Sequence, residues 1–183
     1  MFVITGPSGV GKGTLIRELT ARLPELRLSI SATTRAPRPG EADGVDYHFM
    51  DADEFERRVR AGEFVEHATY SGNRYGTLRS ELDRQGDGDA PVVLEIEVQG
   101  ARQVRAKLPN AVAVFIAPLS REALRDRLVG RGTDTPEQVD ARLQTAAGEL
   151  AAQREFRHVV VNDRLAEAVD ELVAIVRRAS ARA

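Results

Sequence analysis

A glycine-rich turn near the start of the chain constrains its fold more than any other feature. Residues 6–11 read GPSGVG and directly follow the apolar run 1–5. Beyond the turn, apolar residues recur at helical spacing, at Leu15, Ile16, Leu19 and Leu23. The turn therefore joins a buried strand to a helix, which is the unit from which α/β sheets are built.

Later apolar runs continue this alternation of strand and helix. Residues 91–97, 111–117 and 159–162 lack polar alternation, as is typical of strands buried on both faces of a parallel sheet. Helical patterns lie between and after these runs, around 102–108, 121–129 and 165–179. We expect an α/β fold with a doubly wound parallel sheet as its core.

Two segments break the alternation and are predicted to be insertions at the edge of the core. The first, 31–84, contains a capping-box helix start at Asp51 and Glu54, and aromatic residues such as Tyr47 and Phe49 that favour short antiparallel strands. The second, 121–155, contains a helix start with Pro136 in its first turn. We expect a single domain over 1–183, whose core consists of 1–30, 85–120 and 156–183.

The composition excludes several classes of function. The chain has no cysteine, so it carries no disulfide, thiolate metal site or cysteine nucleophile, and a reducing cytoplasm is expected. A net charge of −2 gives no global attraction to nucleic acid or to an anionic membrane. The first apolar run is too short for a signal peptide, and no run is long enough to span a bilayer. We expect a cytoplasmic monomer or small homo-oligomer that binds neither nucleic acid nor membrane.

The glycine-rich turn also predicts a chemistry, because glycines allow backbone N–H groups to point inward around phosphate oxygens. The helix dipole and the Lys12 ammonium add positive charge at the same point. Strand, loop and helix together are typical of a P-loop NTPase, and we expect ATP to bind there. The predicted ATP-binding residues of the loop are Gly6, Pro7, Ser8, Gly9, Val10, Gly11, Lys12, Gly13 and Thr14.

A magnesium ion is expected beside this loop, although the usual position of its protein ligand differs. The P-loop pattern places Ser or Thr directly after the lysine, where this chain has Gly13 followed by Thr14. Glu95 and Glu97 close the strand that begins at Pro91, at the sheet edge where ligands of such folds bind. These carboxylates are suited to hold metal-bound water or substrate, and we expect Mg²⁺ near Thr14 and Glu95.

The segment 31–49 is the most specific stretch of the sequence. Arg35 and Arg38 lie on either side of Pro37, and Tyr47 follows nine residues after Arg38. Two guanidinium groups and a phenolic hydroxyl are suited to bind one phosphate monoester. This stretch resembles the acceptor-site signature of the guanylate kinase family. The resemblance extends over the glycine-rich loop and over 71–77, 95–100, 130–135 and 161–163.

The resemblance implies transfer of the γ-phosphoryl group of ATP to GMP, with magnesium, in a P-loop core that carries a small mixed α/β GMP-binding insertion (31–84) and a helical lid (121–155). In the family, the residues matching Arg35, Arg38 and the two tyrosines hold the GMP phosphate. Glu66 matches a carboxylate that accepts hydrogen bonds from the paired N–H donors of guanine. The implied GMP-binding residues are Ser31, Arg35, Arg38, Tyr47, Glu66, Tyr75, Thr77 and Glu97.

The resemblance also implies a set of catalytic cations. Arg127, Arg131 and Arg142 match lid arginines of the family, and Asn162 matches a residue near adenine. The attacking phosphate oxygen is already anionic at neutral pH, so the main obstacle is repulsion between two polyanions. The expected catalytic residues are Lys12, Arg35, Arg127, Arg131 and Arg142. Closure of both insertions over the core is expected to exclude water.

Two alternatives share part of this pattern. Guanylate-kinase-like modules of scaffold proteins bind phosphopeptides without catalysis, but their phosphate loops are generally degraded, whereas this one is intact. A related P-loop kinase of ribose bisphosphate would not need a guanine-reading edge, which Glu66 and Thr77 would supply here. Glu97 stands where the family more usually has aspartate, and its extra methylene shifts the carboxylate relative to the base or the metal.

Overall fold

The computed structural model describes residues 1–83, 90–130 and 136–181 of the chain. Within these ranges, the central sheet consists of parallel strands in the order β2-β7-β1-β8-β9. They are β1 (Phe2–Thr5), β2 (Arg27–Leu28), β7 (Val92–Glu95), β8 (Val112–Ala117) and β9 (His158–Val161). Val3 of the central strand β1 lies beside Leu94 on one side and Ala113 on the other. The predicted parallel sheet is confirmed.

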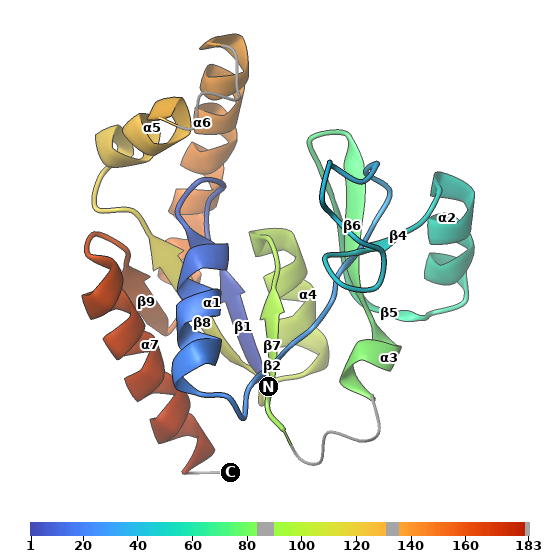
Figure 1. Ribbon diagram of the computed structural model, residues 1–183, viewed down its shortest axis with the longest axis horizontal. Coiled ribbons are helices and arrows are strands. Elements are labelled where there is room, and N and C mark those ends of the chain that lie inside the picture. The colour runs from blue at the N-terminus through green and yellow to red at the C-terminus, as the bar shows by residue number, and fades with distance from the viewer. Residues whose placement is uncertain (84–89, 131–135, 182–183) are drawn as a thin grey trace.

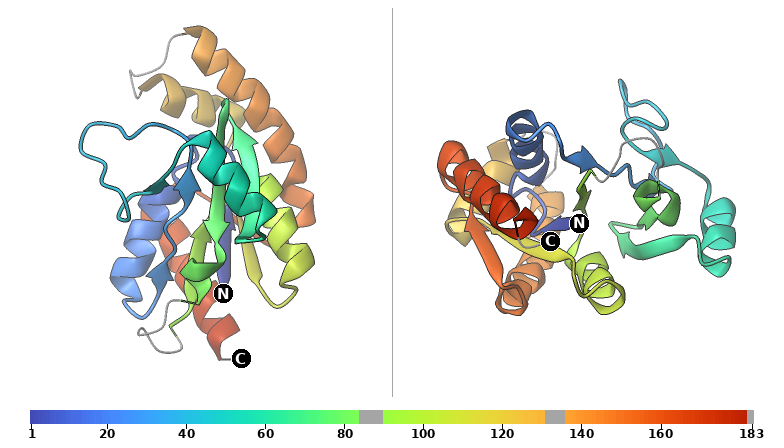
Figure 2. Two further views of the ribbon diagram at one scale, coloured as in Figure 1. Left: turned by 90° about the vertical axis from the view of Figure 1, so that its right-hand side faces the viewer. Right: turned by 90° about the horizontal axis from the view of Figure 1, so that it is seen from below.

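Helices cover both faces of this sheet, because alternate residues of each strand point to opposite faces. Phe2 and Ile4 pack in a cluster with residues of α1 (Lys12–Arg22) and α7 (Leu165–Ser180). Val3 points the other way and packs in a cluster with Val104 of α4 (Val98–Lys107). Figures 1 and 2 show α1 and α7 side by side on one face and α4 on the other. This doubly wound arrangement brings the carboxyl ends of the strands to one edge of the core.

The first insertion (31–84) forms its own small sheet beside the core, in the order β4-β3-β6-β5. Its strands are β3 (Ala32–Thr33), β4 (His48–Phe49), β5 (Phe64–Tyr70) and β6 (Asn73–Leu78), with helices α2 (Ala52–Arg60) and α3 (Arg79–Leu82). The edge strand β5 packs on α4 of the core. Gln103 accepts from the backbone N–H of His67 (3.2 Å) and donates to its carbonyl (2.6 Å), and Lys107 Nζ donates to the Val65 carbonyl (2.6 Å).

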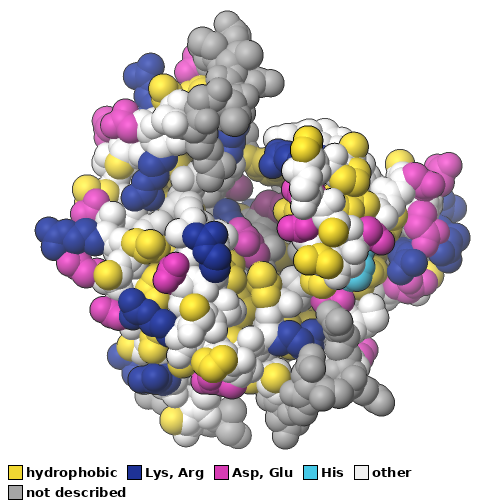
Figure 3. Space-filling view, in the orientation of Figure 1, with side chains coloured by type: hydrophobic (Ala, Val, Ile, Leu, Met, Phe, Trp, Pro, Cys, Tyr) yellow, Lys and Arg dark blue, Asp and Glu magenta, His cyan; other side chains and the backbone are white. Residues whose placement is uncertain are grey.

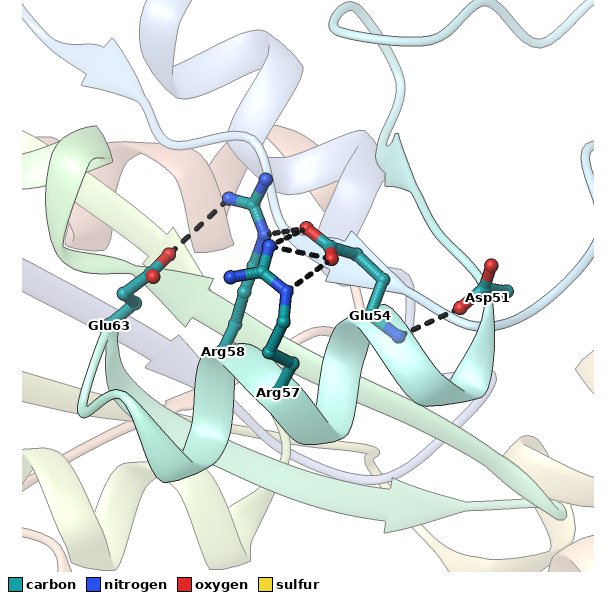
Figure 4. A network of polar contacts seen from close by, with 5 residues as sticks. All are labelled: Asp51, Glu54, Arg57, Arg58 and Glu63. Carbon is teal, nitrogen blue, oxygen red and sulfur yellow. Dashed lines mark hydrogen bonds and ion pairs between the residues drawn. The ribbon is translucent and has the colours of Figure 1, made fainter.

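Helix α2 begins where the capping box predicts. Asp51 is the N-cap, and its Oδ1 accepts a hydrogen bond from the backbone N–H of Glu54 at 2.7 Å. One turn into the helix, the Glu54 carboxylate binds Arg57 and Arg58, both at 2.6 Å (Figure 4). On the inner side Phe55 is fully buried and stacks on Phe64 with ring centroids 4.5 Å apart. The first insertion therefore has a small apolar core of its own.

Of the second insertion (121–155), the described residues form α5 (Arg121–Gly130), α6 (Pro136–Ala151) and the 3₁₀ turn η1 (Ala152–Glu155). Leu124 and Leu128 of α5 pack against Val139 and Ala146 of α6. Figure 1 shows these helices above the carboxyl edge of the central sheet, and the first insertion beside the core. Figure 3 shows the surface hollowed between the core and the first insertion.

The structure corrects three details of the sequence prediction. The strand that begins near Pro91 ends at Glu95, and α4 starts at Val98, four residues before the apolar periodicity indicated. Glu97 is therefore the N-cap of α4 rather than the last residue of a strand. Strand β4 pairs parallel with β3, not antiparallel, because a long loop rather than a tight turn joins them. Tyr47 forms only an isolated bridge with Asp43.

Candidate active site

The turn between β1 and α1 takes a shape that excludes side chains at its glycines. Gly6 and Gly11 have positive φ angles of 143° and 94°. A Cβ atom on Gly6 would lie 2.3 Å from the carbonyl oxygen of Ile116, and one on Gly11 would lie 2.8 Å from Asn162 Nδ2. The backbone of the loop thus lies directly against β8 and the residue after β9. The loop directly precedes the N-terminus of α1, where the helix dipole and free backbone N–H groups favour anions.

Lys12 lies over this loop. Its Nζ atom donates to the carbonyl of Gly6 at 2.8 Å and to that of Pro7 at 3.2 Å. Lys12 therefore places a positive charge directly at the loop. The geometry is that expected of a phosphate-binding loop.

The second insertion contacts the loop at two points. Arg127 donates to the carbonyls of Val10 (3.1 Å) and Asn162 (2.6 Å), and Asn162 Nδ2 donates to the Val10 carbonyl (2.8 Å). Arg142 Nη2 donates to Ser8 Oγ at 2.7 Å. Because Arg127 and Asn162 are both bonded to the carbonyl side of Val10, they brace the loop from outside.

A cavity of about 790 Å³ lies in front of the loop. It is lined by Lys12, Gly13 and Thr14 at the start of α1, and by Arg38 and Tyr47 from the first insertion. The structure thus brings together the two motifs that the sequence singled out. The side chains of Glu95, Glu97 and Glu149 also line the cavity. Burial raises the pKa of each of these carboxyl groups, and the Lys12 charge partly opposes this effect.

The donor groups beside Gly13 suit a magnesium ion. The Glu95 carboxylate lies beside Gly13, where a Cβ atom would be at an ordinary contact distance of 3.7 Å from Oε2. Within the described residues, no three acidic or histidine side chains lie close enough to form a metal cage. Mg²⁺ is commonly bound through one or two carboxylates, water and substrate phosphates, so a cage is not required.

A smaller pocket of about 190 Å³ adjoins this cavity. Lys12, Tyr47, Glu95 and Glu97 line both spaces. The smaller pocket is completed by Ser31, Glu66, Tyr75, Gly76 and Ile96. The two spaces are therefore neighbours, one wide and one narrow, separated by the four side chains that line both.

Glu66 lies at the inner end of the narrow pocket. Its side chain is 1% exposed, and its Oε1 atom accepts a hydrogen bond from Thr77 Oγ1 at 2.7 Å, across the β5–β6 pair. Burial raises the pKa of the Glu66 carboxyl to about 7, although the Thr77 hydrogen bond lowers it. A Cβ atom on Gly100 of α4 would lie 2.3 Å from Glu66 Oε2, so only glycine allows the helix this close to the carboxylate.

Arg35 lies at the rim of the site against aromatic rings. Its guanidinium carbon lies 5.2 Å from the Tyr47 ring centroid and 5.8 Å from that of Phe49. Nη1 donates to the Ala36 carbonyl (2.8 Å), and Nη2 donates to Glu41 (2.9 Å). The rings of Tyr47 and Tyr75 are 6.2 Å apart in an edge-on arrangement. Three of the four predicted phosphate-binding side chains, Arg35, Tyr47 and Tyr75, are therefore neighbours. Arg38 lines the wide cavity, whereas Arg35 is not among the residues that line either space.

Sequence reasoning did not assign two acidic residues of this site. Glu41 binds Arg35, and Glu149 Oε2 accepts from the Ser8 backbone N–H at 3.3 Å. The seven-residue spacing of Glu149 from Arg142, two turns of helix, was the available signal that both face the loop. Arg131, predicted to be catalytic, lies outside the described residues.

Comparison with known proteins gives the family. The family model for guanylate kinase matches residues 1–179. The chain belongs to the guanylate kinase family. It is 52% identical to a guanylate kinase of Thermobifida fusca over 96% of this chain and 90% of that protein. It is 53% identical to one of Frankia casuarinae over 96% of both chains.

A solved structure supports the same membership. The crystal structure of guanylate kinase from Anaplasma phagocytophilum matches with a TM-score of 0.79 and 35% identity, over 97% of this chain and 84% of that one. As a member of this family, the chain is a nucleoside monophosphate kinase. In the described part of the chain, no helix has the length and apolar character needed to cross a membrane.

Proposed function

We propose that the wide cavity binds ATP and the narrow pocket binds GMP, so that the guanylate kinase reaction takes place where the two meet. The observation that carries this proposal is the position of Lys12, which lines both spaces. A γ-phosphoryl group held by the loop would then be next to the phosphate of a nucleotide whose base lies in the narrow pocket. This proximity replaces a bimolecular encounter by an oriented one.

Glu66 and Thr77 would select guanine. An ionised Glu66 can accept two parallel hydrogen bonds from the ring N–H and the exocyclic amine of guanine. Adenine lacks this pair of donors, so binding it would leave the buried carboxylate without its partners. Ser31 and Glu97 line the same space and would contact the remaining edge of the base. Selection of guanine follows from the cost of an unsatisfied buried charge.

Arg35, Arg38, Tyr47 and Tyr75 would hold the GMP phosphate. Arg35 and the two tyrosines adjoin one another, and Arg38 lines the wide cavity. Two unit negative charges 4 Å apart repel by about 1 kcal/mol in water and by several times more in a closed site. Fixed guanidinium groups offset this repulsion, which no proton transfer can relieve because the attacking oxygen is already ionised.

On the donor side, backbone N–H groups of the loop and Lys12 would hold the phosphates of ATP. Glu95, through water, and Thr14 would hold Mg²⁺, which supplies positive charge on the donor phosphates when bound. Arg142 reaches Ser8 of the loop from α6 and would add charge near the transferred group. Arg127 and Asn162 would keep the loop in shape and border the adenine. Arg131 is proposed as a further lid arginine.

The test is ADP release measured with GMP, dGMP, AMP and ribose bisphosphate side by side. We expect activity with GMP and dGMP, and little with AMP or ribose bisphosphate. Glu66→Gln should reduce the preference for GMP over AMP, whereas Lys12→Met should abolish transfer without changing that preference in binding. Equal rates with AMP, or unchanged selectivity in Glu66→Gln, would contradict the assignment. A cytoplasmic location and a monomeric or small homo-oligomeric state stay predictions, and sedimentation velocity tests the second.

A further inference from the structure

The carboxylate of Glu41 joins the two arginines of the proposed phosphate site. Its Oε1 atom accepts from Arg35 Nη2 at 2.9 Å, and its Oε2 atom accepts from the backbone N–H of Arg38 at 2.7 Å. The side chains of Arg35 and Glu41 are only 14% and 19% exposed. Both carboxylate oxygens are thus used, one on each arginine.

Backbone hydrogen bonds fix the position of Glu41 relative to Arg38. The N–H of Glu41 donates to the Arg38 carbonyl at 3.0 Å, while the Glu41 side chain returns to the Arg38 N–H. The pair of bonds closes the turn 38–41 from both sides, as a capping box closes a helix start. Gly40, with a φ of 89°, provides the reversal that brings the carboxylate back. Glu41 therefore fixes where the Arg38 side chain leaves the backbone.

The same carboxylate completes the constraints on the Arg35 guanidinium. Nη1 is bonded to the Ala36 carbonyl, Nη2 to Glu41, and the plane lies near the rings of Tyr47 and Phe49. A guanidinium carries five N–H donors, and these two bonds use two of them. Three donors stay available in a fixed orientation for a phosphate. A guanidinium held in this way loses less conformational entropy when it binds.

Other carboxylates of the same loop differ from Glu41. Asp46 accepts from the Ala42 N–H and Asp43 from the Phe49 N–H, both at 2.8 Å. In the described residues, neither Asp43 nor Asp46 contacts a guanidinium group, so these two carboxylates shape the loop alone. Glu41 both shapes the loop and contacts a cation of the site.

We propose that Glu41 is a positioning residue for the acceptor phosphate, which orients Arg35 and the Arg38 turn so that both guanidinium groups meet the phosphate of GMP. This inference rests on the proposed function, because it takes the Arg35 and Arg38 pair as the phosphate site. The opposite role is that of a competitor, in which the carboxylate occupies Arg35 and the phosphate must displace it. The donor count favours positioning, since the phosphate can bind without breaking the Glu41 contact.

The two roles predict opposite changes in affinity. We would measure the Kd of GMP and of guanosine by calorimetry at pH 8, together with KM and kcat for GMP at saturating ATP. Glu41→Ala should raise the Kd and KM for GMP by about tenfold or more, because a displaced guanidinium loses its alignment. The Kd of guanosine should not change, since guanosine has no phosphate. Glu41→Gln should lose less GMP affinity than Glu41→Ala, because its amide oxygen can still accept one of the two hydrogen bonds.

Two further variants make the result unambiguous. Glu54→Ala is the matched control, because Glu54 also binds two arginines but lines neither space of the site, and it should leave both affinities unchanged. Arg35→Met tests the proposed function itself: if its GMP affinity equals that of the wild type, the phosphate site is wrong. If Arg35→Met loses GMP affinity but Glu41→Ala and Glu41→Gln bind GMP equally or more tightly, only the positioning role is wrong. An equal loss of guanosine affinity would also overturn that role.

Discussion

The Glu66 carboxylate links guanine recognition to protein stability, and substitution by glutamine separates the two. The carboxyl group titrates near pH 4.5 in an unfolded chain and near 7 in the buried site. Between these values the folded protein binds more protons than the unfolded chain, so the free energy of unfolding falls as pH rises through this window. This difference between the two pKa values corresponds to about 3 kcal/mol, which is the extra free energy needed to ionise the group in the folded protein.

Glu66→Gln keeps an acceptor for the Thr77 hydroxyl and removes the ionisation. We therefore expect the unfolding free energy of the variant, relative to wild type, to rise by about 2 to 3 kcal/mol between pH 5 and pH 8. Any cost of the added amide N–H donors is the same at both pH values and cancels from this change. Urea unfolding of both proteins at a series of pH values measures it. A difference that stays constant with pH would refute the argument.

The same substitution should change GMP binding in the opposite direction. The ionised fraction of a group with a pKa near 7 falls about tenfold between pH 8 and pH 6, and only the ionised form accepts both guanine N–H donors. Wild-type affinity for GMP should therefore fall about tenfold more than that of Glu66→Gln over this range. The GMP phosphate also titrates in this range, but its effect on affinity is the same for both proteins and cancels in the comparison. A stability gain together with a loss of recognition is the trade-off expected at a binding site.

Three other predictions concern the supports of the site. Gly100→Ala should displace Glu66, because the added Cβ would lie 2.3 Å from Oε2; kcat/KM for GMP should fall at least tenfold while ATP affinity is unchanged. Arg127→Ala removes donors from the carbonyls of Val10 and Asn162; we expect a loss of about 1 to 3 kcal/mol in urea unfolding and a higher KM for ATP. Asp51→Ala removes the N-cap of α2 and should cost about 1 kcal/mol without changing kcat, and Asp51→Asn should restore most of it.

Local signals in the sequence predicted the parts of the fold that depend on local physics. The turn 6–11 needs positive φ angles and close approach, so its glycines indicated both strand and helix. The capping box at Asp51 placed the start of α2, because the cap is a hydrogen bond between residues only three positions apart. Strand β2 has only two residues, Arg27 and Leu28, and gives no periodicity to detect.

Other features depend on contacts between distant segments, which periodicity does not carry. The start of α4 at Val98 was missed because Gly100 weakens the helical pattern. Glycine occurs at position 100 because the Glu66 carboxylate lies against the helix there. The parallel pairing of β4 is set by the path of the loop 34–47. The contact of Glu149 with Ser8 spans 141 positions in the chain. The motif resemblance named candidate site residues, but it did not indicate that Glu41 and Glu149 would form hydrogen bonds with Arg35 and Ser8.

The contact of α4 with β5 has a consequence for behaviour outside the active site. β5 is the edge strand of its sheet, and an exposed edge is a template for pairing with other chains. Gln103 and Lys107, one helical turn apart, bond instead to the outward carbonyls of His67 and Val65 and to the His67 N–H. Side chains of a helix thus take the place of a neighbouring strand. This cover should prevent the β5 edge from pairing with strands of other chains, and it should slow amide exchange at His67.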